Sequence, residues 1–302
     1  MDVSFIIVNY NSAALVLNCV SSIRQFTQGL KYEIILVDNA SPDRTVDALL
    51  NELQGDDCVF VQLNENKGFG AGNNAALTVA KGRYLFLLNP DTRLCSNAAG
   101  IFMNIMDQAE WQQVAACGAD LINGNGVSVQ AYGNFPTWFA AFASFGLQYV
   151  MPKFYRRHIS LGAVNQGKDN KLVDYISGAA MFIRRSVIDQ IGLFDEDFFM
   201  FFEETEWAYR ANKAGFKLYL IPAVQIIHLE GGSEYRDNVH ASFSMRRFRM
   251  FEQSRQLFYR KTRGRFFASC MKPFDLMHML QRTWRGKEGG NWLEKTKVIF
   301  AA

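Results

Sequence analysis

The sequence predicts an α/β fold with a mostly parallel, Rossmann-like central sheet flanked by helices, and with a basic helical appendage at its C-terminal end. Over residues 1–120, short β-branched or apolar runs alternate with segments of helical period, a pattern typical of βαβ units. Three of the runs end in polar residues, which is expected at the ligand-binding edge of such a sheet. From residue 241 onward, aromatic and basic residues interleave at helical spacing.

In the first half of the chain, each predicted strand is followed by a predicted helix. The strands are expected at Val3–Asn9, Glu33–Val37, Val59–Leu63 and Arg83–Asn89. The helices are expected at Ala13–Phe26, Arg44–Leu53, Gly70–Ala80 and Asn97–Gln108. This alternation predicts a parallel sheet that is covered on both faces.

The second half is less periodic. Residues 124–171 are rich in glycine, asparagine and aromatic residues, so we expect long loops there. A strand near Tyr175–Ile183, a helix at Glu203–Ala214 and a strand at Lys217–Ile221, which Pro222 stops, are expected to follow. These elements complete the predicted domain.

Charge divides the chain into two parts. Residues 1–241 hold 18 basic and 25 acidic residues, whereas residues 242–302 hold 14 and 4. We therefore predict a folded domain followed by a basic amphipathic helical appendage. The boundaries are 1–240 for the domain, with two halves at 1–123 and 124–240, and 241–302 for the appendage.

Composition limits the class of protein. The chain has 302 residues, 49% hydrophobic and 20% charged, so it can bury a full core and is not a disordered chain. Its five cysteines include no Cys-x-x-Cys pair, which fits neither a disulfide framework nor a zinc knuckle and favours a reducing cytoplasm.

The N-terminus enters an apolar run at residues 3–8 without the basic flank and cleavage site of a signal peptide, so we expect a core strand and no export. The longest nearly apolar stretch, Trp138 to Met151, is shorter than the roughly 20 residues that span a bilayer. The sequence therefore predicts a cytoplasmic protein that can touch a membrane without crossing it.

Polar residues follow three predicted strands, at 9–11, 38–41 and 89–91. Because the carboxyl ends of parallel strands share one edge, these residues are expected to converge on one crevice. A carboxylate at the position of Asp38 suits hydrogen bonding to a nucleotide base or ribose, whereas the residues from Ser41 to Asp43 are explained as a turn and helix cap.

A segment at residues 64–74 holds three glycines in five positions before a helix. Glycines allow a backbone to approach a ligand closely, and a helix N-terminus favours phosphate. The segment lacks the lysine-serine ending of a P-loop, so a plain loop and helix cap is an equally good interpretation of it alone.

Asp91 follows a strand that is predicted to be buried on both faces, and Pro90 fixes the turn so that Asp91 is expected to point from the sheet edge into solvent. It could simply begin a turn, or it could hold a divalent cation beside a diphosphate. His228 follows another strand-like run. A single histidine is usually structural, but Mn²⁺ accepts imidazole alongside carboxylate.

Three acids, Glu203, Glu204 and Glu206, follow an aromatic run at residues 198–202. One or two acids in the first turn of a helix are explained by the helix dipole. Three acids beside five large apolar residues favour a general base, because desolvation and like-charge repulsion raise a carboxylate pKa. The residue pattern does not select among the three.

The motifs occur in the order found in family 2 glycosyltransferases with the GT-A fold, and the chain resembles that family over about residues 3 to 265. It looks most like the bacterial rhamnosyltransferase branch that builds O-antigen and related cell-envelope polysaccharides. The resemblance rests on these segments: Val8–Asn11, Val37–Ser41, Asn66–Gly70, Leu88–Asp91, Ser177–Ala179, Phe202–Trp207 and His228.

The resemblance implies an inverting single displacement from a nucleotide sugar, dTDP-rhamnose or a UDP-sugar, to a polyprenyl-diphosphate-linked glycan. It implies that residues 1–123 form the donor-nucleotide half of a nucleotide-sugar-binding and catalytic domain and that residues 124–240 form its acceptor and catalytic half. It implies a Mg²⁺ or Mn²⁺ site at Asp91 and His228 and a catalytic base at Glu204, with Glu203 and Glu206 as alternatives. The implied substrate-binding residues are Asn9, Tyr10, Asn11, Asp38, Asn39, Lys67, Gly70, Asn73, Asn89, Gly178 and Trp207.

Two departures from the family pattern concern the metal and the base. The usual Asp-x-Asp motif is replaced by Asn89-Pro90-Asp91, which leaves one fewer carboxylate for the metal. The usual Glu-Asp-x-Asp run is replaced by the four residues 203–206, with longer side chains at two positions. The choice of base among the three glutamates therefore stays open.

Two other functions, nucleotidyl transfer and non-catalytic nucleotide-sugar binding, are alternatives to glycosyl transfer. A sugar-1-phosphate nucleotidyltransferase needs a glycine-rich phosphate loop after the first strand, where this chain has Asn9-Tyr10-Asn11. A non-catalytic nucleotide-sugar-binding membrane scaffold could dispense with the three glutamates.

The appendage has three possible roles. Nucleic-acid binding is disfavoured because the body of the chain is acidic. Contact with the anionic inner face of the bacterial cytoplasmic membrane, and packing of the helices on the core, are both left open.

Overall fold

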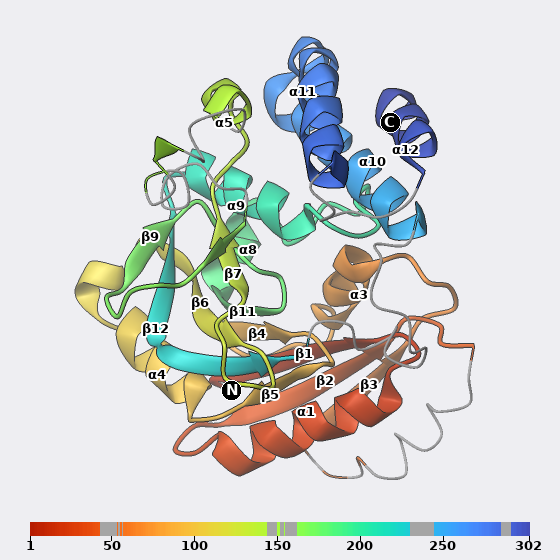
Figure 1. Ribbon diagram of the computed structural model, residues 1–302. Helices are drawn as coiled ribbons and strands as arrows, with labels where there is room; N and C mark the ends of the chain where they lie inside the picture. Colours follow the sequence, from red (N-terminus) through yellow and green to blue (C-terminus); the bar gives the residue numbers. More distant parts are fainter. Residues whose placement is uncertain are drawn as a thin grey trace.

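The computed structural model describes residues 1–42, 53, 55, 57–143, 150, 151, 154, 162–229, 245–284 and 291–302. Its largest element is a nine-stranded sheet (Figure 1). The strand order is β3 (Cys58–Gln62), β2 (Tyr32–Asp38), β1 (Val3–Asn9), β4 (Tyr84–Leu88), β11 (Ala180–Arg184), β6 (Val114–Ile122), β12 (Lys217–His228) and β5 (Thr92–Leu94), and β9 (Lys171–Val173) pairs with β12 outside this path.

Most strands of this sheet point in one direction. β1, β2, β3, β4, β6 and β12 share a direction, and β5, β9 and β11 run against them. The predicted α/β class with a mostly parallel central sheet is confirmed.

The first half of the sheet forms because its strands are short, mostly apolar runs between polar turns. All seven residues of β1 are buried. The helices α1 (Ala13–Phe26), α3 (Phe69–Ala76) and α4 (Ala98–Met106) agree with the predicted helices, and Figure 1 shows α1 and α3 on opposite sides of the sheet. The helix predicted at Arg44–Leu53 lies outside the described residues, apart from Leu53. Close packing of α3 on β1 needs glycine, because a Cβ at Gly72 would lie 2.7 Å from Cγ1 of Val8.

The second half contains more structure than the predicted loops. A small antiparallel sheet forms from β10 (Tyr175–Ile176), β7 (Gln130–Gly133) and β8 (Ala163–Val164). The single strand predicted over Tyr175–Ile183 is wrong, because the chain turns at residues 177–179 and passes from the small sheet at β10 to the large sheet at β11. Among its described residues, this half also contains the helices α5 (Trp138–Ala143), α8 (Arg185–Ile191) and α9 (Glu203–Lys213), and the short helix η1 (Ala109–Trp111) lies just before β6.

The prediction that Pro222 stops a strand is also wrong. β12 continues through Pro222 to His228. The register of β12 against β6 shifts between Ile221 and Gln225, so the residue without an N–H lies where the ladder is interrupted. The continuation matters for the site, because it carries His228 to the sheet edge.

The C-terminal segment is helical, as predicted, with α10 (Met245–Arg263), α11 (Arg265–Trp284) and α12 (Trp292–Ala301). Figure 1 shows these helices beside α5 and α9, on the side of the molecule away from α1. The buried rings of α10 pack on the segment before α9, in a cluster that contains Phe198, Phe202, Phe258, Tyr259, Phe267 and Met271. Among the described residues, no helix combines the length and apolar content needed to span a bilayer.

Candidate active site

The carboxyl ends of β1 and β2 meet, as predicted. The parallel register pairs Asn9 with Asp38, and the buried Asp38 carboxylate accepts four hydrogen bonds. They come from Asn9 Nδ2 at 2.7 Å, Ser41 N at 3.0 Å, Ser41 Oγ at 2.6 Å and Gln62 Nε2 at 2.7 Å. Asp38 therefore fixes the turn above the sheet edge, and its acceptor positions are engaged within the protein.

Two residues beside this pair have left-handed backbone conformations. Asn11 has φ 55° and Ala40 has φ 56°. Ser41 Oγ ties the two loops together by accepting the N–H of Asn11 at 3.0 Å, and Tyr10 stands exposed between them. Such conformations cost about 1–3 kcal/mol each and cluster at ligand sites, which supports the crevice predicted here.

Asn39 connects this edge to the glycine-rich segment. Its Nδ2 donates to Asn66 Oδ1 and to Gly68 O, both at 3.0 Å, and its Oδ1 accepts from Lys67 N at 3.2 Å. The Lys67 side chain is largely exposed and pairs with Glu65 at 3.3 Å. Asn39 therefore holds the turn after β2 against the glycine-rich segment. Lys67, with its exposed side chain, can reach an anionic ligand.

Two further residues of the glycine-rich segment serve α3 itself. Asn73 is buried and donates to Phe69 O at 2.9 Å. Gly70 lets α3 pack closely on its neighbours, because a Cβ there would lie 3.1 Å from Cβ of Phe194 and 3.7 Å from Cβ of Glu203. The structure thus gives both residues a packing role next to the acids.

The predicted metal ligands Asp91 and His228 lie together. β5 pairs antiparallel with the end of β12, which places His228 opposite Thr92, and His228 Nε2 lies 3.4 Å from Asp91 Oδ1. The prediction that Asp91 points into solvent is wrong. The end of β12 lies against it, with His228 beside its carboxylate and Leu229 N donating to its carbonyl oxygen, and Asp91 is only 8% exposed. A shielded carboxylate and imidazole at one point of the sheet edge can bind a cation more strongly than exposed ones.

Asn89 holds the turn that presents Asp91. Its carbonyl accepts hydrogen bonds from Thr92 N at 3.1 Å and Thr92 Oγ1 at 2.7 Å, and its N–H donates to Ala179 O at 2.9 Å. The last bond joins the metal-side turn to the turn at Gly178. The main chain of Asn89 thus couples two predicted site segments.

Of the three predicted acids, Glu206 is committed to an ion pair. Arg210 Nε lies 2.8 and 2.9 Å from its two oxygens, and the other Arg210 nitrogens donate to Ile191 O and Leu193 O. Burial raises the pKa of Glu206, and the charge of Arg210 opposes that shift. Glu206 therefore anchors α9 to the segment after α8.

Glu203 and Glu204 have different surroundings although they are adjacent. Glu203 is buried, and its Oε2 has no hydrogen-bond partner among the residues that the structure describes. Burial, and then the charge of Glu204, raise the pKa of Glu203 well above its ordinary value. Glu204 is partly exposed and accepts the Thr205 hydroxyl at 3.0 Å, and burial raises its pKa too.

Gly178 lies against Glu204, since a Cβ at Gly178 would be 3.8 Å from Cβ and Cγ of Glu204. The predicted sugar-pocket glycine and the partly exposed acid therefore face each other. Glu204 is the one of the three acids that combines access with a neighbouring small residue, so the geometry favours it as the base.

Trp207, predicted to bind substrate, belongs instead to the core. It is fully buried and its Nε1 donates to Gly192 O at 3.1 Å. The burial of Trp207 follows from its position on α9. Residues three or four apart share a helix face, and Trp207 lies four residues after Glu203, which is also buried.

Sequence reasoning missed Gln62 and Lys261. Gln62 pairs in register with Asp38 and donates to it, and a polar residue at the end of a strand beside Asp38 was the available signal. Lys261 on α10 lies 2.5 Å from both Asp195 and Asp197, just before the aromatic run. Lys261 belongs to the basic run of the appendage, and its two aspartate partners are more than 60 residues away in the sequence. No local pattern therefore indicates these ion pairs.

Solved structures of two other proteins share this fold. The chain is similar to GalNAc-T7, solved with UDP, GalNAc and Mn²⁺, with a TM-score of 0.58, 18% identity and coverage of 86% of this chain and 50% of that chain. It is also similar to residues 1–349 of TarS from S. aureus, solved with UDP, with a TM-score of 0.54, 13% identity and coverage of 100% and 91%. The fold is GT-A, and the chain spans half of the GalNAc-T7 chain.

The family model for glycosyl transferase family 2 matches residues 4–192. The protein therefore belongs to glycosyltransferase family 2, as the motif order indicated. This membership favours glycosyl transfer over nucleotidyl transfer.

Named relatives transfer hexoses. The low-salt glycan biosynthesis hexosyltransferase Agl10 of Haloferax volcanii is 28% identical over 275 residues, which cover 89% of this chain and 75% of the relative. The N-acetylglucosaminyl-diphospho-decaprenol L-rhamnosyltransferase of Mycobacterium tuberculosis is 25% identical over 219 residues, 68% of each chain. The rhamnosyltransferase WbbL of Escherichia coli is 25% identical over 191 residues, 60% of this chain and 66% of WbbL.

Proposed function

We propose that the protein is a metal-dependent inverting glycosyltransferase in which Glu204 is the general base and Asp91 and His228 hold the cation. One observation carries the proposal: the hydrogen bond from Asn89 N to Ala179 O joins the turn of Asp91 to the turn of Gly178, which lies against Glu204. This link supports a leaving-group site and a base on connected segments, the arrangement that a single displacement requires.

The chemistry follows from these positions. An acceptor hydroxyl oxygen attacks the anomeric carbon of the donor while Glu204 takes the hydroxyl proton, and the bond between that carbon and the diphosphate oxygen breaks. The raised pKa of Glu204 makes it a better proton acceptor than an ordinary carboxylate. Attack on the face opposite the leaving group inverts the anomeric centre.

The residues present fit a divalent cation. Mg²⁺ is usually held by one or two carboxylates together with substrate phosphates, and Mn²⁺ also accepts imidazole. In the part of the chain that the structure describes, no trio of histidine, cysteine, aspartate or glutamate side chains gathers, so Asp91 and His228 would share the ion with the donor diphosphate. The cation would stabilise negative charge on the leaving group.

For the donor we propose dTDP-rhamnose or a UDP-sugar, and for the acceptor a polyprenyl-diphosphate-linked glycan of a bacterial cell-surface polysaccharide such as O-antigen. The names of the rhamnosyltransferase relatives support this choice. The turns at 9–11 and 38–41 would hold the nucleoside, with Asn9 and Asp38 shaping the site and Tyr10 exposed to it.

We further propose that the protein works on the inner face of the cytoplasmic membrane and meets it through α11 and α12, rather than through the whole appendage. Five large apolar side chains of these two helices are more than half exposed: Phe266, Trp284, Trp292, Leu293 and Phe300. The aromatic rings of α10 are instead largely engaged with the catalytic domain. A membrane position would bring a lipid-linked acceptor to the site.

A donor panel with Asp91→Asn tests the site. With Mn²⁺ or Mg²⁺ present, the correct nucleotide sugar should raise the melting temperature of the wild type, because a ligand that binds only the folded state stabilises it. Asp91→Asn should keep the melting temperature of the free protein within a few degrees and abolish both the donor shift and metal-stimulated turnover.

Asp189→Asn, at an exposed acid on α8, is the matched control and should behave as the wild type. Full metal-stimulated activity in Asp91→Asn would refute the site.

A further inference from the structure

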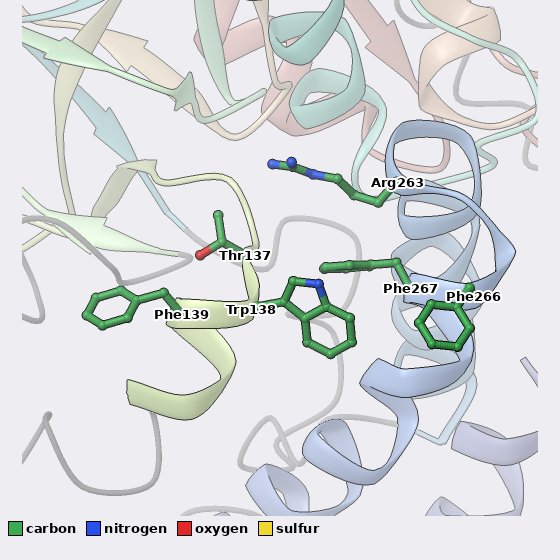
Figure 2. A pocket seen from close by; sticks show the side chains of 6 residues that line it. All are labelled: Thr137, Trp138, Phe139, Arg263, Phe266 and Phe267. Atoms are coloured by element: carbon green, nitrogen blue, oxygen red, sulfur yellow. The ribbon is translucent and has the colours of Figure 1, made fainter.

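A pocket lies outside the sheet edge, between α5 and the junction of α10 with α11. Its volume is about 450 Å³, within the range of small-molecule sites. Figure 2 shows the six lining residues, Thr137, Trp138, Phe139, Arg263, Phe266 and Phe267. Four of them are aromatic, and the mechanism above uses none of them.

The wall of the pocket combines apolar rings with a cation. Trp138 and Phe267 stack edge to face at 4.7 Å and form its packed base, whereas Phe139 and Phe266 are 60% and 80% exposed. The exposed guanidinium of Arg263 extends over this apolar surface from the end of α10 (Figure 2). Such a surface complements a molecule that joins an apolar chain to an anionic head.

The pocket is connected to the catalytic helix. The Arg263 guanidinium lies 5.6 Å from the ring centre of Tyr209 on α9, and the Tyr209 hydroxyl donates to Thr262 O at 3.2 Å. Phe135, just before α5, packs on Tyr209 at 5.4 Å. Tyr209 follows Glu204 on α9, so the cationic end of the pocket faces the helix that carries the proposed base.

A second link runs through β10. The N–H of Phe135 donates to Asp174 Oδ2 at 2.7 Å, and Asp174 precedes Tyr175. β10 packs against α9, the helix of Glu204. Burial raises the pKa of Tyr175, and the charge of Glu204 adds to that rise. Contacts through Tyr209 and Phe135 therefore link the pocket to α9 and to β10.

We propose that this pocket binds the isoprenoid chain of the acceptor next to its diphosphate, with Arg263 holding a phosphate and the aromatic rings holding the first isoprene units. The inference rests on the proposed function, because it assigns the lipid part of that acceptor. Farther from the diphosphate, the isoprenoid chain would continue past Phe266 along α11. The exposed apolar residues of α11 are among those proposed to meet the membrane.

The test uses the full-length protein and radiolabelled farnesyl diphosphate in equilibrium dialysis, without divalent metal and with excess UDP. The wild type should bind the probe. Phe266→Ser and Arg263→Gln should each weaken binding about tenfold, by loss of apolar contact and of a charged hydrogen bond respectively. Both residues are exposed, so the variants should fold, which their melting temperatures verify.

Two matched variants control for general effects. Trp284→Ser removes an aromatic ring that is 87% exposed at the other end of α11, and Arg265→Gln removes an adjacent exposed cation that does not line the pocket. Both should bind the probe as the wild type does. Farnesol has no phosphate, so Phe266→Ser should weaken its binding and Arg263→Gln should leave its binding unchanged.

Unchanged binding in Phe266→Ser and Arg263→Gln, or no binding of the probe to the wild type while UDP is in excess, would overturn the pocket assignment. Glu204→Gln should bind the probe normally. A protein that binds the probe through this pocket and turns over no donor would contradict the proposed function alone, so the two failures are distinguishable.

Discussion

At the scale of single residues, three neighbouring glutamates have three different environments. Glu206 is paired with Arg210, Glu203 is buried with an oxygen that lacks a partner, and Glu204 is partly exposed beside Gly178. Two adjacent carboxylates that influence each other do not both ionise easily. We infer that Glu203 holds its proton more strongly and that Glu204 is the first of the two acids to ionise.

Glu203→Gln should therefore change the pH dependence of stability. A carboxyl whose folded pKa is raised keeps its proton in the folded state above pH about 4.3, where the unfolded chain has lost it. Between the unfolded pKa and the raised folded pKa of Glu203, the free energy of unfolding of the wild type falls as pH rises. In Glu203→Gln the side chain does not titrate, so this fall is absent. The free energy of unfolding of Glu203→Gln relative to the wild type should rise with pH, as measured by urea unfolding from pH 4.5 to 8.

Glu110→Gln, at an exposed acid in η1, is the control for this series and should show a flat difference. A flat difference for Glu203→Gln as well would show that Glu203 is ionised in the folded protein, and the division of roles between the two acids would fail.

At the scale of elements, the segment at 194–202 is held from two sides. Asn74 on α3 exchanges two hydrogen bonds with the main chain of Phe194, and Phe69 N donates to Phe199 O at 3.0 Å. From α10, Ser254 Oγ donates to Met200 O at 2.7 Å. The segment ends in Phe201 and Phe202, with φ 70° and 66°, a strained pair that packing against α10 sustains.

Gly68→Ala tests this bracing. Gly68 has φ 94°, and a Cβ there would lie 2.0 Å from Phe199 O, a main-chain atom that cannot move aside cheaply. Gly29 has φ 75° with nothing within 4 Å of an added Cβ. Gly29→Ala is therefore destabilised only by placing alanine in a left-handed conformation, which costs roughly 1–2 kcal/mol. Urea unfolding should show Gly68→Ala to be destabilised by about 1–3 kcal/mol more than Gly29→Ala.

Because the acids follow this segment directly, Gly68→Ala should also lower the turnover rate, whereas Gly29→Ala should not. Equal stability and equal turnover in the two variants would show that the contact with Phe199 does not position α9.

At the scale of the whole molecule, the parallel half of the sheet and its helices were predictable because buried apolar runs between polar turns have few alternatives. The path of β12 was not, because a proline that normally ends a strand lies here at a register shift. Residue roles were harder still: Asp38 and Trp207 have side chains that suit a ligand, and only tertiary contacts show that the protein itself engages them.

The appendage illustrates the same limit. Its interleaved rings and arginines fit a membrane helix and a packed helix equally well. Phe258 is buried against the segment before α9, whereas Trp284 is exposed, and nothing in their local sequence separates them. The contact partners of α10 lie far away in the chain, so the pattern alone could not assign its role.

Membrane contact through α11 and α12 predicts binding to vesicles that contain phosphatidylglycerol and weaker binding to pure phosphatidylcholine. The double variant Trp284→Ser and Trp292→Ser should reduce sedimentation with anionic vesicles several-fold, and added salt should do the same by screening. Undiminished sedimentation of the double variant would rule these helices out as the contact surface.

The central claim is that this sheet edge transfers a sugar with Glu204 as the base. It is tested most directly by the rate of nucleoside diphosphate release from the donor that stabilises the protein, with acceptor and Mn²⁺ present, for the wild type and Glu204→Gln. We predict that Glu204→Gln folds and binds donor normally and loses at least about a hundredfold in rate, the usual contribution of a general base. Normal turnover in Glu204→Gln would contradict the claim.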